Sequence, residues 1–502
     1  MKVLVYSIAG HGFQEACQYE AALEQSFYGN EVLFLYCDGS LGLCGENQRA
    51  SCLRCKLCAH SFKKRIKNNL NTTIRSVPLG DYITKEIEEE VDNISFTYQN
   101  NEDLKKLFFH GVDIGYGALS SYISWTRNLN PHFHGVVKEY FGVMLRTEAL
   151  LTLIIEKVLS EFPADLIIFH NGRYFFYKPV YRLAEIRNIP FICTETTHDI
   201  DLKVYREFID NNVPHSVDTW TNNINRYWDN DTDVVNRKKI GEMFFYNRRH
   251  AKYSGDTIYS KDQIDGKLPA DFNKSKENIV IFNSSEDELG AIGQEVEKYA
   301  LFKSQYDAIV AIAERYKDDK TKHFYLRVHP NLKDLPYNYH VNLYKLNYPN
   351  LTVIPGNSDI SSYALMDVAD KVIVFGSTMG VESAFWKKPV ICMSFAFYYN
   401  LGCVYTPKSR EEAWRLIETK DLPILNYEAA LKYGYRILTP KKEKFRFLNM
   451  DGSTFIFKGR IRRYSSVNKF LGSTKMSFVL SQISNILFEK MPFWGRFSNI
   501  PV

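Results

Sequence analysis

Alternating strand and helix patterns occur twice in succession along this chain, and this feature constrains its fold more than any other. Short apolar runs bounded by turn residues have the form of buried strands, and stretches with helical periodicity separate them. In the first half the expected strands are residues 2–8, 31–37, 166–170 and 191–194. In the second half they are residues 278–282, 323–328, 351–354, 372–375 and 390–393. Because strand–helix–strand units build parallel sheets, we expect an α/β fold of two Rossmann-like domains with a cleft between them.

The length of 502 residues suits two large domains, and a hydrophobic content of 45% is ample for their cores. Residues 222–262 are rich in Asn, Asp and Arg and have no strand pattern, so we place the domain junction there. We therefore expect a first domain over 1–250, a second over 251–435, and a basic, aromatic-rich tail over 436–502 that packs back on the first domain. Within the second domain, the pattern over 295–316 predicts one long helical stretch.

The net charge of +5 is unevenly distributed. Residues 441–502 hold twelve Lys or Arg and three acidic residues, so this segment carries +9 and the remainder −4. Such a segment is either a solvated basic face or a surface for anionic lipid headgroups or a polyanionic glycan; nucleic acid is the least expected partner. The start of the chain lacks a secretory cleavage pattern, and no run reaches the roughly 18 apolar residues of a membrane span. We expect a cytoplasmic protein, with peripheral attachment to the inner face of the cell membrane.

A cation and an imidazole follow the strand expected at 323–328. Arg327 and His329 are two residues apart, so on an extended chain they project to the same face, and Pro330 fixes the turn that follows. Arg binds phosphate through two parallel hydrogen bonds, and His donates a further one. The pair predicts a phosphate site at the strand end; the alternative is a structural His satisfied by a nearby backbone group.

A turn of small residues follows the strand expected at 372–375. It contains Gly376, Ser377 and Thr378 and leads into a helix that carries Glu382 one turn after Thr378. Free N–H groups and the helix dipole attract an anion, and a carboxylate at this place suits the hydroxyls of a ribose. The alternative is ordinary capping by Ser377 or Thr378, with Glu382 complementing the dipole.

A third polar turn follows the strand expected at 278–282. We expect Ser284 and Ser285 to line the cleft. The alternative is a capping box, in which Ser285 caps the next helix and Glu288 completes the box.

Polar residues also follow the expected strands of the first half. Asn171 and Arg173 come directly after the strand at 166–170, and both suit sugar hydroxyls, a carboxylate or a phosphate. Glu195 and His198 follow the strand at 191–194, and His11 lies in a Gly-His-Gly turn after the first strand. We expect these side chains to face the cleft; the alternative for each is an ordinary polar loop residue.

Six of the nine cysteines lie in the first 58 residues. Cys52, Cys55 and Cys58 recur at three-residue spacing, with Cys44 or Cys37 available as a fourth ligand. Four thiolates hold structural zinc, and an iron–sulfur cluster is the second metal alternative. The remaining alternative is a set of reduced thiols packed on one helix face, since a cytosolic protein does not build a disulfide framework.

Together, the three motifs of the second half resemble the donor-binding domain of GT-B glycosyltransferases, in particular bacterial capsule and surface-polysaccharide transferases. The His329-Pro330 pair looks like the one in bacterial sialyltransferases and Kdo transferases, which use CMP-sugars. The turn leading to Glu382 looks like the ribose-binding helix of GT-B enzymes and UDP-sugar 2-epimerases. In the first half, residues 170–173 and 244–249 (FFYNRR) resemble stretches of capsule-synthesis transferases. The acidic-acidic-Gly motif of sialyltransferases is absent, which weighs against sialyl transfer and leaves CMP, UDP and GDP open as the nucleotide.

The resemblance implies an enzyme that moves a sugar from a nucleotide-sugar donor to a surface polysaccharide or its lipid-linked precursor. Donor contacts would come from Arg327, His329, Glu382 and the small-residue turns, and acceptor contacts from Asn171 and Arg173. An inverting transfer needs a general base, for which Glu195 and His329 are favoured over His198 and His11. No cofactor is required for catalysis, because GT-B enzymes neutralise the donor phosphates with protein groups. The alternatives are a nucleotide-sugar 2-epimerase, a polyol-phosphate transferase, and a non-catalytic polyanion-binding scaffold.

Overall fold

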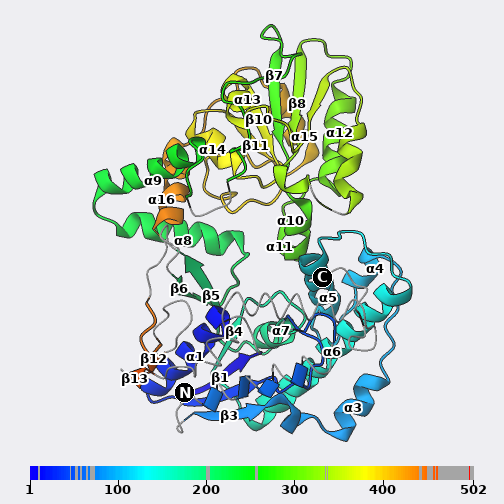
Figure 1. Cartoon of the computed structure of the whole chain (residues 1–502), viewed down its shortest axis with the longest axis vertical. Helices are drawn as coiled ribbons and strands as arrows, with labels where there is room; N and C mark the ends of the chain where they lie inside the picture. The colour runs from blue at the N-terminus through cyan, green and yellow to red at the C-terminus, as the bar shows by residue number, and fades with distance from the viewer. Residues whose placement is uncertain are drawn as a thin grey trace.

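The computed structural model folds the chain into two α/β domains stacked along its long axis (Figure 1). The described residues are 1–8, 12–45, 47–50, 55–56, 59–60, 62–63, 66–67, 70, 74–198, 204–254, 258–333, 335, 337–439, 444–448, 456–457, 460–461 and 497. Each domain is built around a mainly parallel sheet, so the α/β class and the two Rossmann-like domains expected from the sequence are confirmed.

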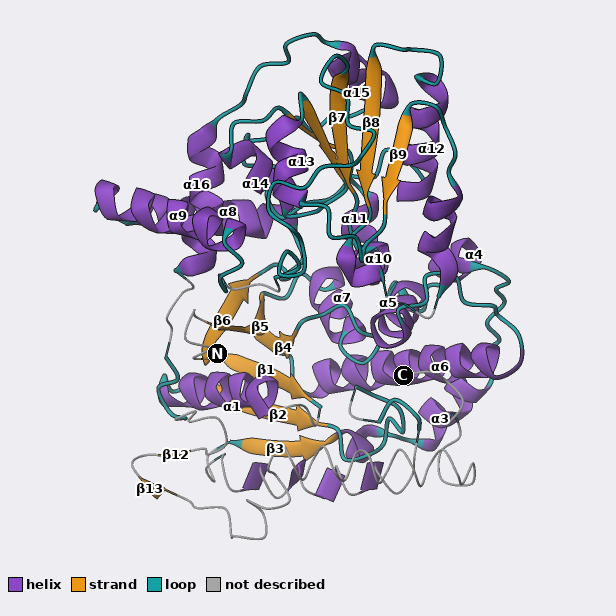
Figure 2. Cartoon of the chain, turned by 45° about the horizontal axis from the view of Figure 1, so that its top comes forward, coloured by secondary structure: helices purple, strands orange, loops and turns teal. Residues whose placement is uncertain are grey.

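The first sheet has six strands in the order β3-β2-β1-β4-β5-β6, and only β6 runs antiparallel to its neighbour. Its strands are β1 (Lys2–Ser7), β2 (Glu31–Tyr36), β3 (Arg75–Pro78), β4 (Leu166–His170), β5 (Phe191–His198) and β6 (Val204–Asp210). Alternate residues of β1 enter two different cores: Val3 and Val5 pack beneath α1 (Gly12–Phe27), whereas Leu4 and Tyr6 face the opposite layer of helices. Burial on both faces explains why β1 is a continuous apolar run (Figure 2).

Helices cover both faces of this first sheet. The layer opposite α1 is formed chiefly by α5 (Ile114–Thr126), α6 (Gly135–Glu161) and α7 (Lys178–Ile186). The shorter elements η1 (Leu79–Tyr82), α3 (Lys85–Asp92) and α4 (Asn101–Lys105) precede them. The 27-residue α6 supplies a large part of the core from its buried face, including Phe141, Met144 and Leu145.

The second sheet has five parallel strands in the order β11-β10-β7-β8-β9. Its strands are β7 (Glu277–Phe282), β8 (Lys322–Arg327), β9 (Leu351–Ile354), β10 (Lys371–Val374) and β11 (Val390–Cys392). Helices and 3-10 turns of this domain are α10 (Glu286–Ile292), α11 (Gln294–Glu297), α12 (Gln305–Arg315), η2 (Pro330–Leu332), η3 (Asn338–Lys345), α13 (Ser362–Val368), α14 (Met379–Phe385), α15 (Arg410–Glu418) and α16 (Tyr427–Leu438). The strands β8 and β9 lie on one side of β7, and the later strands β10 and β11 lie on its other side. The switch point of this sheet therefore lies between β7 and β10.

The single helical stretch expected over 295–316 is interrupted in the structure. It is divided into α11 and α12, which are separated by residues 298–304. Ser304 begins α12 as its N-cap, where its hydroxyl accepts a hydrogen bond from Asp307 N at 3.0 Å. Periodicity alone does not reveal this break, because both segments carry apolar residues at helical spacing.

Two helices that precede residue 250 pack on the second domain. These are α8 (Val217–Asn230) and α9 (Val234–Arg249), and their buried Trp228, Phe244 and Phe245 share a core with β7, β10 and α16. The helices α9 and α16 cross at Gly241 and Gly434, where a Cβ on Gly434 would lie 2.5 Å from the carbonyl oxygen of Gly241. By packing, the second domain thus begins near residue 217, ahead of the boundary expected at 250.

The domains meet through α5 of the first and α10–α11 of the second (Figure 1). The hydroxyl of Ser120 donates to the carbonyl of Ala291 at 2.5 Å, and Arg182 Nη2 donates to Gln294 Oε1 at 2.7 Å. Lys105 Nζ pairs with Glu297 at 2.8 Å. The junction is therefore largely polar, and both ends of the α10–α11 segment carry an ion pair to the first domain.

Part of the C-terminal tail lies against the first domain. The buried carboxylate of Glu20 accepts hydrogen bonds from the backbone N–H groups of Arg446, Phe447 and Leu448, and the Leu448 side chain joins the core beneath α1. Phe497 packs edge-on against Tyr140. The structure also describes the short hairpin strands β12 (Ile456–Phe457) and β13 (Arg460–Ile461). Among the described helices, none has the length and apolar character needed to cross a membrane.

Candidate functional site

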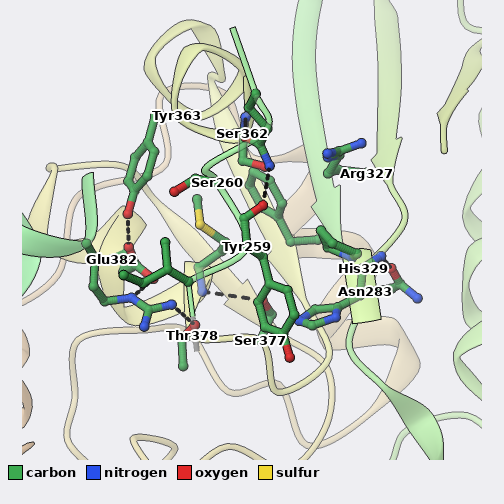
Figure 3. Close-up of a pocket in the computed structure, with 16 residues that line it drawn as sticks. Tyr259, Ser260, Asn283, Arg327, His329, Ser362, Tyr363, Ser377, Thr378 and Glu382 are labelled. Atoms are coloured by element: carbon green, nitrogen blue, oxygen red, sulfur yellow. Dashed lines mark hydrogen bonds and ion pairs between the residues drawn. The ribbon is translucent and has the colours of Figure 1, made fainter. Parts of the chain in front are cut away.

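A pocket opens at the carboxyl end of the second sheet, at its switch point (Figure 3). Polar side chains reach it from the ends of β7, β8 and β10, from the end of α9, and from the loop 258–263. Its lining residues are Arg248, Ile258, Tyr259, Ser260, Gln263, Phe282, Asn283, Arg327, His329, Pro330, Ser362, Tyr363, Ser377, Thr378, Met379 and Glu382. All of them belong to the second domain and its α9 helix. Five residues expected at a donor site, namely Arg327, His329, Ser377, Thr378 and Glu382, are thus brought together.

One side of the pocket is a buried ion pair. Arg248 Nε donates to Glu382 Oε1 at 2.8 Å, and Arg248 Nη2 donates to Thr378 Oγ1 at 3.1 Å. The second carboxylate oxygen of Glu382 accepts a hydrogen bond from the Tyr363 hydroxyl at 2.5 Å. Glu382 has no exposed surface, so its charge is balanced within the protein by Arg248. As expected, Thr378 and Glu382 lie on the same side of α14, and Arg248 bridges them.

The opposite side of the pocket carries His329. The backbone N–H of Asn331 donates to His329 Nδ1 at 3.2 Å, so in the neutral ring the proton resides on Nε2. Desolvation, with a contribution from the nearby charge of Arg327, lowers the pKa of His329 to about 4. At neutral pH the ring is therefore an uncharged donor of one hydrogen bond through Nε2. A donor of this kind suits a phosphate oxygen, whereas a role for His329 as the general base stays a prediction.

Arg327 is buried at the end of β8. Its two terminal nitrogens donate to the backbone carbonyls of Pro355 and Ser358, the latter at 3.0 Å. Burial lowers the pKa of Arg327 to about 10, which still leaves the guanidinium charged at neutral pH. Among the described residues no carboxylate forms an ion pair with it, and Nε has no hydrogen-bond partner. The pocket thus holds a positive charge without a direct ion-pair partner among the described residues, although the more distant Asp359 also acts on it.

Tyr259 lies between these two sides (Figure 3). Its ring packs edge-on against His329 with 5.0 Å between the ring centres. In the same loop, Gln263 Oε1 accepts a hydrogen bond from the backbone N–H of Ser362 at 2.8 Å, which ties this loop to the start of α13. An aromatic ring at this place offers a flat apolar surface to a ligand whose polar groups contact the two sides.

The turn after β10 requires glycine at its first position. Gly376 has a φ of 101°, and a Cβ there would lie 2.5 Å from the carbonyl oxygen of Phe395. Ser377 is held by the Tyr398 hydroxyl, which donates to its carbonyl, and its own hydroxyl accepts from Met379 N at 3.3 Å. Gly376 therefore shapes the turn that presents Ser377 and Thr378 to the pocket, and it does not itself line the cavity.

Ser284 and Ser285 are not among the pocket-lining residues. The Ser284 hydroxyl donates to the carbonyl of Phe375 at 2.7 Å and accepts from Gln305 Nε2 at 2.9 Å, so it joins two strand ends. Ser285 forms no side-chain cap on α10, and Glu288 instead accepts a hydrogen bond from Asn331 Nδ2 at 2.7 Å. The alternative of a capping box is therefore wrong, and both serines act as internal connections of the second domain.

In the first domain, Asn171 and Glu195 meet at the carboxyl ends of β4 and β5. Asn171 Nδ2 donates to Glu195 Oε1 at 2.7 Å and lies 3.4 Å from His215 Nε2. Asn171 has a φ of 58°, a left-handed conformation that Asn tolerates better than most residues. Burial, with a smaller effect of Arg173, lowers the pKa of His215 to about 3, so this imidazole is neutral. Asn171, predicted to bind the acceptor, is therefore in direct contact with Glu195, predicted as the general base.

Arg173 occupies the domain junction. Its Nη1 donates to Ser124 Oγ and to the carbonyl of Ala291 in the second domain, both at 3.0 Å, and its Nη2 donates to the Tyr174 hydroxyl at 2.6 Å. Both terminal nitrogens are thus committed to protein partners in this conformation. A role for Arg173 in acceptor binding stays a prediction.

Several predicted residues lie outside the part of the chain that the structure describes. His11, Cys52 and Cys58 fall in this group, as does the side chain of His198. Cys44 is buried, and Cys55 donates through Sγ to the carbonyl of Gly39 at 3.3 Å. Among the described residues no group of three or more His, Cys, Asp or Glu is arranged to hold a metal ion. The thiolate zinc or iron–sulfur site therefore stays a prediction.

Three of the pocket residues that were not singled out as site residues from the sequence carry much of its geometry. Arg248 lies in the FFYNRR stretch, Tyr259 lies in a segment without a regular pattern, and Tyr363 lies in an ordinary helix pattern. Arg248 and Tyr259 lie at the predicted domain junction, whereas Tyr363 lies in the helix expected at 362–369, so the three share no local signal. Their convergence depends on tertiary contacts, with Arg248 and Glu382 134 residues apart.

No protein-family model matches the chain, and no curated protein matches it in sequence. The chain is similar to solved structures of other proteins, three of which are described next. KpsC from Thermosulfurimonas dismutans, a beta Kdo 2,4 transferase, is 14% identical with a TM-score of 0.34, over 54% of this chain and 78% of that one. UDP-GlcNAc 2-epimerase from Neisseria meningitidis, bound to UDP-GlcNAc, is 11% identical with a TM-score of 0.23, over 87% and 98%. The glycosyltransferase SnogD from Streptomyces nogalater is 12% identical with a TM-score of 0.23, over 88% and 96%.

Proposed function

We propose that this protein is a glycosyltransferase that binds a nucleotide-sugar donor in the pocket of its second domain. The observation that carries the proposal is the placement of a buried Arg327, which has no direct ion-pair partner among the described residues, beside the His329 imidazole at the carboxyl end of a parallel sheet. A buried positive charge beside a hydrogen-bond donor suits the phosphate of a nucleotide. The acceptor would be a surface glycan, such as capsule, or its lipid-linked precursor, as the resemblance of the motifs implies.

The two sides of the pocket suggest separate tasks. Arg327 and the Nε2–H of His329 would contact the donor phosphate, whereas the Glu382 carboxylate would accept the hydroxyls of the ribose. Each oxygen of Glu382 already accepts one hydrogen bond, from Arg248 or from Tyr363. A carboxylate has about four lone-pair sites, so two are left for the ribose, but Glu382 is fully buried and the ribose would reach them only after Arg248 or Tyr363 moves aside. The Tyr259 ring would then pack against the nucleotide between these groups.

The acceptor side would use Glu195 as the general base. In an inverting transfer, Glu195 takes the proton of the acceptor hydroxyl while that oxygen bonds to the anomeric carbon of the donor sugar. The bond from this carbon to the phosphate oxygen breaks, and the electron pair leaves with the phosphate, whose charge Arg327 and His329 would stabilise. The contact from Asn171 Nδ2 holds one Glu195 oxygen and leaves the other available to the substrate. No metal ion is needed in this scheme.

Replacing His329 by Gln tests the donor site. The variant loses the imidazole Nε2–H, and we expect nucleotide affinity to fall about 10- to 100-fold, which corresponds to about 1.4 to 2.7 kcal/mol. The measurement is a thermal-shift and calorimetric titration with CMP, UDP, GDP and CDP. His323 lies on the same strand β8 and bonds Thr352 Oγ1 away from the pocket, so His323→Gln is the matched control and should bind as the wild type does. Equal affinity in both variants would contradict the donor assignment.

Glu195→Gln tests the acceptor side. The amide cannot accept the proton, so we expect the rate of transfer to fall by about 10²- to 10⁴-fold while nucleotide affinity stays unchanged. The measurement compares the turnover of labelled donor with the calorimetric binding of the nucleotide. The same assay with UDP-GlcNAc and no acceptor separates the alternatives, because only an epimerase converts the donor alone. A variant with normal transfer would remove Glu195 from the mechanism.

A further inference from the structure

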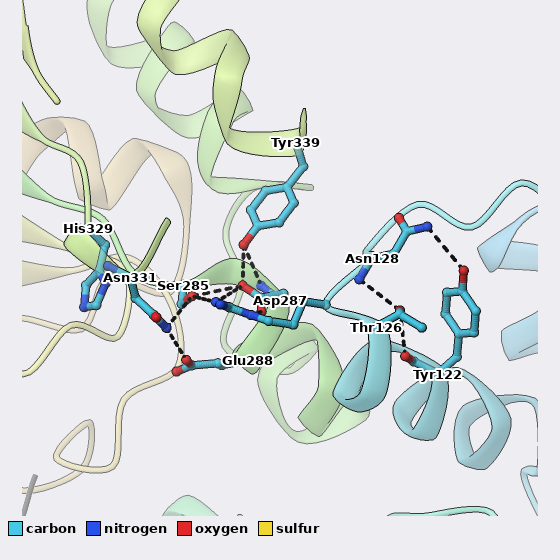
Figure 4. Close-up of polar contacts among 10 residues, drawn as sticks. Tyr122, Thr126, Asn128, Ser285, Asp287, Glu288, His329, Asn331 and Tyr339 are labelled. Carbon is cyan, nitrogen blue, oxygen red and sulfur yellow. Dashed lines mark hydrogen bonds and ion pairs between the residues drawn. The ribbon is translucent and has the colours of Figure 1, made fainter. Parts of the chain in front are cut away.

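A chain of hydrogen bonds runs from the first domain to the donor pocket of the second (Figure 4). It begins at Arg127, which follows the end of α5. Arg127 Nε donates to Asp287 Oδ2 at 2.6 Å, and Nη2 donates to Ser285 Oγ at 2.9 Å and to Asp287 Oδ1 at 3.4 Å. Ser285 and Asp287 belong to the second domain, at the beginning of α10. A planar guanidinium thus joins two side chains of the other domain at once.

The acceptor of this contact is deeply buried. Asp287 is 2% exposed and also accepts hydrogen bonds from the Ser285 hydroxyl at 2.9 Å and from the Tyr339 hydroxyl. A buried carboxylate requires a countercharge, and among the described residues Arg127 is the cation that forms an ion pair with it. The first domain therefore supplies the charge that the start of α10 needs.

The backbone of Arg127 is held in an unusual conformation. Its φ is 60° and its ψ is 16°, the left-handed region that a β-substituted residue rarely adopts. The neighbouring Thr126 hydroxyl accepts from Asn128 N at 3.1 Å, and Asn128 Nδ2 donates to the Tyr122 hydroxyl at 3.3 Å. These contacts brace the turn, so the direction in which Arg127 leaves α5 is set before it meets the second domain.

The chain of contacts continues to His329. Asn331 Nδ2 donates to Ser285 Oγ at 3.3 Å and to Glu288 Oε1 at 2.7 Å. The backbone N–H of the same Asn331 donates to His329 Nδ1 and thereby determines which ring nitrogen carries the proton. Arg127 is thus separated from the His329 ring by two residues, Ser285 and Asn331, and it touches neither the ring nor the pocket lining.

We propose that Arg127 is a positioning residue for the donor pocket of the other domain: its contacts with Asp287 and Ser285 hold Asn331, which in turn holds His329 as the Nε2–H tautomer. The proposal rests on the proposed function insofar as His329 contacts the donor. On this proposal, the donor site is complete only when the first domain is docked on α10. The site would then couple the arrangement of the two domains to nucleotide affinity.

Arg127→Gln tests the proposal, with Lys105→Gln as the matched control. Both variants remove an ion pair between the domains, but the Lys105–Glu297 pair lies on α11 and leads to no pocket residue. We expect Arg127→Gln to weaken nucleotide binding about tenfold and Lys105→Gln to leave it unchanged. Arg127→Lys keeps the charge but cannot bond Asp287 and Ser285 together, and it should fall between the two.

A second measurement reports on the ring itself and needs no ligand. The charges acting on His329 come from Arg327, Asp287, Arg127 and Arg248; Asp287 raises its pKa, and the three arginines lower it. Removing Arg127 should therefore raise the pKa of His329, and Asp287→Asn should lower it. Nitrogen-15 NMR of the imidazoles, assigned through His329→Gln, gives both the pKa and the tautomer, and Arg127→Gln should reduce the Nε2–H fraction.

The outcomes separate the two proposals. If Arg127→Gln and Lys105→Gln affect binding equally and the His329 signals do not change, the positioning role of Arg127 is wrong and the donor site stands. If the wild type binds no nucleotide, the proposed function fails, while the NMR measurement still decides whether Arg127 controls His329.

Discussion

Glu382→Gln should lower the free energy of unfolding by about 3 kcal/mol and abolish measurable nucleotide binding. The reason is that Arg248, whose side chain is 11% exposed, would keep its charge in the interior after losing its ion pair with Glu382. The hydroxyl of Tyr363 would at the same time lose its carboxylate acceptor. Urea denaturation gives the stability change, and a thermal-shift titration with nucleotides gives the loss of binding.

The neighbouring arginine provides a control for this effect. Arg249 pairs with Asp367, whose side chain is 44% exposed, and a surface pair of this kind contributes only about 0 to 1 kcal/mol. Asp367→Asn should therefore be nearly neutral. In the double variant Arg248→Gln, Glu382→Gln, the destabilisation should be smaller than the sum of the two single changes, because either single change already breaks the ion pair between these two side chains. An Asp367→Asn variant as unstable as Glu382→Gln would contradict this account of the pocket.

Glu148→Gln should change how stability depends on pH. Glu148 is fully buried in α6, neither carboxylate oxygen has a described hydrogen-bond partner, and its pKa is raised well above the usual value, chiefly by burial. Unfolded Glu loses its proton near pH 4.3, whereas the folded chain keeps it to higher pH. The wild type should therefore lose about 1.4 kcal/mol of stability per pH unit between the pKa of unfolded Glu and the pKa of Glu148 in the folded protein. The Glu148→Gln variant should not show this loss.

The test is the difference between the two unfolding curves across pH. Urea denaturation from pH 5 to pH 9 gives the free energy of unfolding of both proteins. Subtracting one from the other cancels the contribution of every ionisable group that the two proteins share. Two charged neighbours act on Glu148, since Lys178 lowers its pKa and Asp113 raises it. Lys178→Met should therefore extend the loss of stability to higher pH in a chain that retains Glu148, without changing its slope. A constant difference at all pH values would show that Glu148 is ionised in the folded protein.

Strands that are buried on both faces were well predicted from the sequence. The runs at β1 and β7 are apolar at nearly every position because helices cover both sides of each sheet. The helices α8 and α9 were not recognised, since their exposed surfaces are rich in Asn, Asp and Arg. Their few apolar anchors, such as Trp228 and Phe245, are buried by α16, which lies about 200 positions further along the chain.

Part of the site could also be predicted, because the parallel sheet determines where the strands end. Residues at strand ends converge wherever the strands are parallel neighbours, so Arg327, His329 and Glu382 could be grouped from their positions alone. The functions of Ser285 and Arg248 could not be predicted. A local capping box is the usual expectation for Ser285, but its hydroxyl is bonded by Arg127 of the other domain. Contacts between domains leave no local pattern in the sequence.

The contact between Glu20 and residues 446–448 has a consequence for the order in which the protein is made. Glu20 is synthesised early, yet three of its hydrogen-bond donors lie beyond the whole second domain. The Glu20 carboxylate therefore lacks these donors until more than 400 residues have been added after it, including the whole second domain. A chain that stops after α16 would retain both sheets but would leave this carboxylate and the apolar site of Leu448 uncovered. Residues that follow the whole second domain thus complete the packing of the first.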